Sequence, residues 1–243
     1  MPDLAAMLAA IDFGSAPGSD WAICALILTA TLPFQPWLPL RHGPLIHPWL
    51  GSMVLLPLLW STEHLLPNGM SMHVSSACLM TLMFGWPLAM WSLVPAALAS
   101  GWMGHGHFPP LGEVVSHLAW LGLVPGTLGL FIGLAIRRLL PNHVFVFILG
   151  RAFLGSIAAV VLSGWLALMA GRKPEVLGTL EWMLGYTLVA WGEGFSTGML
   201  IATFVAFKPQ WVLTYSDERY LPGRPDRPRQ PGPPPSSSFK DED

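Results

Sequence analysis

The chain has 243 residues, of which 53% are hydrophobic and only 11% are charged, whereas soluble globular domains carry about 25% charged residues. This composition, with a mean hydropathy of +0.53, excludes an ordinary water-soluble domain and indicates a protein embedded in the lipid bilayer. The net charge of −2 comes with no basic stripe, which excludes a nucleic-acid-binding surface.

Residues 1–20 form the first predicted segment. They carry Asp3, Asp12 and Asp20 and lack the positively charged start of a secretory signal peptide. We therefore expect this segment to stay on the chain and to lie on the extracytoplasmic side of the membrane.

Six apolar stretches follow, and each reaches or approaches the roughly 20 residues that a helix needs to cross about 30 Å of hydrocarbon. They are residues 21–40, 45–66, 72–100, 112–136, 143–170 and 180–207. The third stretch is too long for one span, and Gly85-Trp86-Pro87 divides it because proline cannot continue a helical hydrogen-bond ladder. We predict two short helices there, 72–84 and 88–100, and thus an all-α polytopic transmembrane helical bundle of about seven spans.

The positions of the basic residues test this number of spans, because Lys and Arg collect in cytoplasmic loops. With seven spans and an external N-terminus, the basic residues on the inner side are Arg41, Arg137, Arg138, Lys208 and those of the tail. Only Arg172 and Lys173 disagree, whereas six spans would move Arg41 outside. We therefore predict an external N-terminus and a cytoplasmic C-terminus in a cell membrane, in bacteria the inner membrane.

The polar end of the chain differs in composition from the transmembrane domain, which we place at residues 21–208. Residues 209–243 are rich in proline, serine and charged side chains. Such a segment buries too little apolar surface to offset its ordering entropy. We therefore predict a largely disordered cytoplasmic tail.

Potential metal ligands are dense between the second and third stretches. They are Glu63, His64, Met70, Met72 and His73, and the predicted spans place them at one external helix–loop–helix corner. Imidazole suits zinc, copper, iron or nickel, and thioether sulfur favours soft ions such as Cu(I). The structural alternative is that the histidines bind interfacial water and the methionines fill gaps.

A second group of ligands, His105 and His107, flanks Gly106 in the loop before residues 112–136. Both imidazoles can turn toward one ion, so this loop is a candidate for metal capture at the outer face. The alternative is that these histidines are ordinary polar loop residues.

Glu193 stands between Gly192 and Gly194 inside the last span, where small residues let helices approach closely. A buried carboxylate needs a partner, either a cation such as Arg151 or a backbone N–H donor. We interpret Glu193 as a structural residue.

Three stretches in this order resemble the CbiM-like family of cobalt/nickel permeases, the substrate-binding membrane subunits of energy-coupling-factor (ECF) ABC transporters. Residues 68–73, followed by Gly85-Trp86-Pro87, resemble the family's corner-histidine segment and its subsequent turn. Residues 123–138 resemble its Gly-rich fifth span, and Gly192-Glu193-Gly194 resembles its Gly-Glu-Gly signature. The resemblance covers roughly residues 45–207.

The resemblance implies an externally open, seven-span metal-binding subunit that works with a membrane coupling subunit and cytoplasmic ATPases. It also implies that the metal is the transported ion and that no cofactor is permanently bound. In the family the corner histidine, here His73, is joined by the N-terminal amine and a histidine in second position. This chain begins Met1-Pro2-Asp3 and has no histidine before His42.

The amine–imidazole pair is therefore not expected here, and His64, Met70 and Met72 are the expected replacements beside His73. Cobalt or nickel follows from the resemblance, with copper or zinc as alternatives.

Two other functions stand beside metal uptake. The chain could be an assembly or regulatory factor that kept the scaffold without transport. It could also be a membrane-embedded enzyme that uses Glu63 and His64 as acid–base groups, but no Ser/His/Asp constellation or HExxH motif supports this. We therefore predict a transport protein without catalytic residues.

Overall fold

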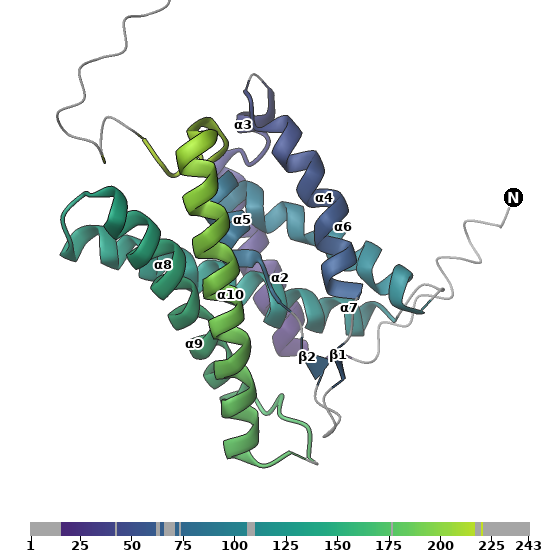
Figure 1. The fold of residues 1–243 in the computed structure, drawn as a ribbon. Coiled ribbons are helices and arrows are strands. Elements are labelled where there is room, and N and C mark those ends of the chain that lie inside the picture. Colours follow the sequence, from purple (N-terminus) through teal and green to yellow (C-terminus); the bar gives the residue numbers. More distant parts are fainter. Residues whose placement is uncertain are drawn as a thin grey trace, which may run out of the picture.

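The computed structural model describes residues 16–41, 43–61, 64–65, 71–72, 74–105, 110–175, 177–216 and 220. At residues 41, 64, 65, 71, 72, 104 and 105 only the backbone is described. Nearly all of the described chain is helical, and the helices pack into one bundle (Figure 1). The prediction of an all-α membrane protein is therefore confirmed.

The first half of the described chain ends in a broken pair of helices. Its elements are α2 (Gly18–Thr31), the 3₁₀ turn η1 (Leu32–Phe34), α3 (Leu38–Arg41), α4 (Ile46–Ser61), β1 (His64–Leu65), β2 (Ser71–Met72), α5 (Ala77–Phe84) and α6 (Trp86–His105). The break predicted at Gly85-Trp86-Pro87 is confirmed, because Gly85 ends α5 with a φ of 78°, which glycine adopts without steric cost. Pro87 lies in the first turn of α6, where a missing N–H is tolerated. Of the two helices predicted to be short, α5 is short, whereas α6 continues past residue 100 to His105.

The second half consists of long helices. Its elements are α7 (Leu111–His117), the π-helical segment η2 (Leu118–Leu123), α8 (Val124–Leu139), the π-helical segment η3 (Val146–Leu154), α9 (Gly155–Met169), α10 (Thr179–Phe207) and the 3₁₀ turn η4 (Pro209–Trp211). The helix Leu111–Leu139 is continuous, and its π-helical turns immediately precede Pro125, which has no N–H to donate into the preceding turn.

Three described helices are long and apolar enough to cross a membrane, namely Leu111–Leu139, Val146–Met169 and Thr179–Phe207. Gly18–Phe34 and Ile46–Ser61 are apolar but shorter. The number of seven crossings therefore stays a prediction.

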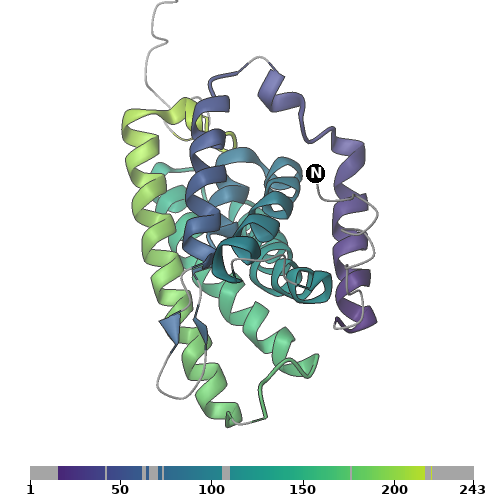
Figure 2. The same ribbon diagram turned by 90° about the vertical axis from the view of Figure 1, so that its right-hand side faces the viewer.

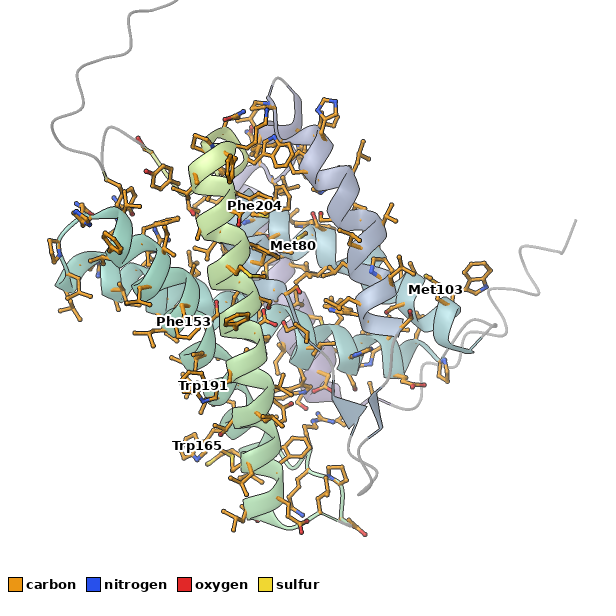
Figure 3. All side chains as sticks on the ribbon, viewed as in Figure 1. Met80, Met103, Phe153, Trp165, Trp191 and Phe204 are labelled. Atoms are coloured by element: carbon orange, nitrogen blue, oxygen red, sulfur yellow. The ribbon has the colours of Figure 1, made fainter. Side chains whose placement is uncertain are left out.

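Apolar side chains cover the outside of the bundle, while polar ones are buried within it. Trp165 and Trp191 point outward from α9 and α10, and Met80 lies inside (Figure 3). Among the buried polar residues are Asp20, Arg151, Glu193 and Thr197. This arrangement is typical of a membrane protein, where ionisable groups face the bundle interior.

Packing continues beyond the end of α10. The backbone N–H of Leu213 donates to the carbonyl of Met83 at 2.8 Å, and the hydroxyl of Thr214 donates to the carbonyl of Leu82 at 2.7 Å. Tyr220 is also buried, so the packed body extends past residue 208. The disorder predicted for the remainder of the tail, residues 221–243, lies outside the described residues.

Candidate metal site

The predicted ligand corner folds back on itself as a short hairpin. Strands β1 and β2 are antiparallel, and their register pairs His64 with Met72 and Leu65 with Ser71. The backbone thus brings His64 opposite Met72, the residue that precedes His73.

The ligand side chains of this corner are not described. Glu63, Met70 and His73 lie outside the described residues, as does His107 of the proposed outer site, and for His64, Met72 and His105 only the backbone is described. The described part of the chain contains no group of three or more His, Cys, Asp or Glu residues that could hold a metal ion. The predicted ligand set therefore stays a prediction.

Three helices hold the loop that follows residue 73. From α4, Trp60 donates its indole N–H to the carbonyl of Ser75 at 3.0 Å. The hydroxyl of Ser75 donates to the carbonyl of Leu121 in η2 at 2.5 Å and accepts the N–H of Ala77 at 3.1 Å. The loop is thus fixed on two sides before α5 begins.

Glu193 of α10 provides the third attachment. Its Oε2 accepts the backbone N–H of Ser76 at 2.8 Å, and its side chain is fully buried. Ser76 precedes α5 with a φ of 53°, a left-handed conformation that is uncommon for residues other than glycine. The carboxylate therefore lies at the N-terminal end of α5, where the helix dipole favours negative charge.

This geometry explains how non-helical backbone enters the bundle. Such backbone is tolerated at membrane depth only where protein surrounds it or where it lines a cavity. Here Ser75 and Ser76 find hydrogen-bond partners on α4, η2 and α10. Of the two partners considered for Glu193, the structure shows a backbone donor. Arg151 instead donates to the hydroxyl of Tyr220 at 3.3 Å and lies over the ring of Phe147.

The hydrogen bond from Trp60 to this loop and the packing of His117 on Trp60 were not predicted from the sequence. The imidazole of His117, at the end of α7, packs against Trp60 with a distance of 5.5 Å between the ring centroids. The only sequence signal for His117 was a histidine within an apolar span. Its neighbour Trp60 is distant in the sequence, so no local pattern could reveal the pair.

The two glycines beside Glu193 have different surroundings. A Cβ at Gly194 would overlap Ile157 and lie 3.0 Å from the carbonyl oxygen of Phe153, whereas a Cβ at Gly192 would meet no atom within 4 Å. Gly194 therefore allows α10 to approach α9 and η3, as predicted for small residues in a span. Gly192 has no such role.

We expect Gly194→Ala to destabilise the protein by about 1–3 kcal/mol, the usual cost of overpacking a close contact. Gly192→Ala is the matched control and should keep or slightly raise stability, because alanine favours a helix over glycine. Folded yield and Tm in detergent measure both effects. If both variants had the same Tm and folded yield, the close contact at Gly194 would be contradicted.

The pattern of the CbiM family, described as the cobalt uptake substrate-specific transmembrane region, matches residues 20–211. No curated protein and no solved structure matches the chain. The matched range includes α2 to η4, the hairpin and the loop held by Glu193. The chain belongs to the CbiM family, whose members are substrate-specific membrane components of cobalt uptake.

Proposed function

We propose that this chain is the substrate-binding component of an energy-coupling-factor-type transporter for transition-metal ions. The observation that carries the proposal is the corner at residues 64–76, where the backbone pairs His64 with Met72 and then enters the bundle at the Ser76–Glu193 hydrogen bond. Cobalt and nickel are the favoured ions, with copper and zinc as alternatives. The metal is cargo, and the chain itself catalyses no reaction.

His73 is the primary ligand in this proposal. It is one residue past β2 and one residue before the described loop at residue 74. His64, Met70, Met72 and Glu63 supply further donors at the same corner. His105 and His107 capture ions at the outer face before they reach it.

The partners in this proposal are a membrane coupling subunit and cytoplasmic ATPases. A substrate-specific component recognises the ion, and nucleotide hydrolysis by its partners drives uptake. Cells that produce the chain with these partners should accumulate radioactive cobalt or nickel. Cells in which the P-loop lysine of the ATPase has been replaced are the control and should not. Metal binding by the purified chain without uptake would favour the assembly or regulatory alternative.

The arrangement of the helix ends supports an external N-terminus and a cytoplasmic tail. Hairpin β1–β2, the start of α2 and the loop between α9 and α10 lie at one end of the bundle, while α3 and the end of α10 lie at the other (Figures 1 and 2). Lys208 follows α10 at this second end. Arg172 and Lys173, which do not follow the rule that basic residues collect on the cytoplasmic side, come after α9 at the first end. There Arg172 pairs with the carboxylate of Asp20.

Single introduced cysteines test this orientation. An impermeant thiol reagent added outside cells should label His105→Cys and Glu175→Cys but not Leu140→Cys or Gln230→Cys. Native Cys24 and Cys78 are buried, so background labelling should be low. External labelling at position 140 or 230 would overturn the orientation.

A further inference from the structure

Two side-chain oxygens on the buried face of α10 have no hydrogen-bond partner in the described part of the chain. They are Oε1 of Glu193 and the hydroxyl oxygen of Thr197. The two side chains are only 0% and 1% exposed, so neither oxygen reaches solvent at the surface. Residues four apart in sequence are neighbours on one face of a helix, and both residues belong to the face of α10 that is buried in the bundle.

The hydroxyl of Thr197 differs from those of the other two threonines inside α10. Thr187 and Thr203 donate their hydroxyls to the carbonyl four residues earlier in the helix, at 2.8 Å and 2.9 Å. For Thr197 this carbonyl is that of Glu193, which accepts the hydroxyl of Ser196 at 3.1 Å instead. The hydroxyl of Thr197 is therefore available for a bond outside its own helix.

The carboxylate of Glu193 lacks a hydrogen-bond donor rather than a source of positive charge. Its Oε2 accepts the backbone N–H of Ser76 at 2.8 Å, just before α5, and the N-terminal end of a helix favours negative charge. No ion pair of the described residues involves Glu193. An ionised carboxylate oxygen only accepts hydrogen bonds, so the missing partner of Oε1 is a neutral donor.

The surroundings of Glu193 include polar groups from two further helices. Cys78 of α5 and Ser156 of α9 are both buried. The thiol of Cys78 interacts with the hydroxyl of Ser156 and with the charge of Glu193. Apolar cavities stay dry, whereas buried polar groups that lack protein partners bind internal water. This part of the bundle therefore suits a water molecule.

We propose that an ordered water molecule is bound inside the bundle between Glu193 and Thr197. The water donates one hydrogen bond to Oε1 of Glu193 and accepts one from the hydroxyl of Thr197, which gives both oxygens a partner. Buried waters of this kind are part of a protein's structure and are costly to remove. Here the water holds the carboxylate that fixes Ser76 at the start of α5.

The test compares Thr197→Val with the wild type by Tm in detergent. If the hydroxyl had no partner, this change would keep or raise the Tm, because it would remove an unsatisfied buried polar group. If the hydroxyl binds the water, the Tm should instead fall by about 2–4 °C, the shift that the loss of one hydrogen bond causes in a chain of this size. Thr187→Val is the matched control on the same helix and should lower the Tm by less, because its hydroxyl bonds only within α10.

A high-resolution crystal structure of the full-length chain gives the second measurement. We expect one density peak within hydrogen-bond distance of both oxygens in the wild type and in Thr197→Ser, which keeps the hydroxyl, and no peak in Thr197→Val. A wild-type structure without the peak would overturn the inference, as would an unchanged or higher Tm for Thr197→Val. Should Thr197→Val fail to fold, the peak in the wild type and in Thr197→Ser decides.

A third measurement distinguishes water from a bound cation. The Tm of the wild type should be the same in sodium chloride and in choline chloride of equal concentration. Stabilisation by sodium that disappears in Thr197→Val would overturn the inference, because the bound species would then be a cation. These outcomes do not depend on metal binding, so the proposed function is tested separately.

Discussion

Replacing His73 with alanine should weaken metal binding by at least about 100-fold, since loss of a direct ligand costs more than the 10–100-fold change typical of outer-shell partners. The neighbouring loop is held by Trp60, Leu121 and Glu193, and none of these bonds uses the side chain of His73. The variant should therefore fold and lose binding specifically. A competition titration of the purified protein measures the effect.

Metal binding should also depend on pH. A ligand imidazole must be neutral, and an unperturbed histidine has a pKa of about 6.5. Protons therefore compete with the metal as the pH falls through this region, and the Kd should rise there. A Kd that stays constant from pH 8 to pH 5 would contradict histidine ligation.

Companion variants locate the site. His64→Ala and the Met70→Leu/Met72→Leu double mutant should bind more weakly than the wild type, and a variant lacking the imidazoles of His105 and His107 is the control for the outer loop. A loss confined to this control variant would move the site to the outer loop. Stoichiometric, tight binding by His73→Ala would refute its assignment as the primary ligand.

Asp20→Ala should destabilise the protein by about 3–5 kcal/mol, the usual cost of removing one partner of a buried ion pair. Asp20 is fully buried and its carboxylate accepts from the guanidinium of Arg172 at 2.5 Å, the hydroxyl of Ser116 at 2.6 Å and the indole N–H of Trp120 at 3.0 Å. Without the carboxylate, these three bonds are lost. Tm and folded yield in detergent measure the result.

A double-mutant cycle separates the ion pair from the other bonds of Asp20. Asp20→Ala/Arg172→Ala should be less destabilised than the sum of the two single variants, because removing both partners leaves no uncompensated charge. Glu175→Ala, at an exposed position of the same loop, is the control and should change stability by no more than about 0.5 kcal/mol. If the destabilisation of the double variant equalled the sum of the two single destabilisations, the pairing of Asp20 with Arg172 would be contradicted.

The ion pair also explains the exception in the distribution of basic residues. In the orientation predicted from the sequence, Arg172 and Lys173 disagree with the rule that basic residues lie on the cytoplasmic side. In the structure, Asp20 balances the charge of Arg172, and Lys173 donates to the carbonyls of Pro174 and Leu177. Asp20 and Arg172 are 152 residues apart, so no local pattern could predict their contact.

The sequence by itself determined the membrane class, the approximate helix bounds and the break at Gly85. These features are local: a spanning helix satisfies its own backbone hydrogen bonds and needs only a run of apolar residues, and the break needs only glycine and proline. The role of Gly194 could also be predicted in part, since a small residue in a span indicates close packing.

Only the tertiary structure decided which buried polar groups meet. Glu193 reaches Ser76 across 117 residues, and Ser75 bonds Trp60 on one side and Leu121 on the other. The spacing of apolar residues indicates where helices lie, but it does not specify which helices are neighbours or how they are rotated. The contact between Trp60 of α4 and His117 of α7 depends on those two properties, because the sequence keeps these helices far apart.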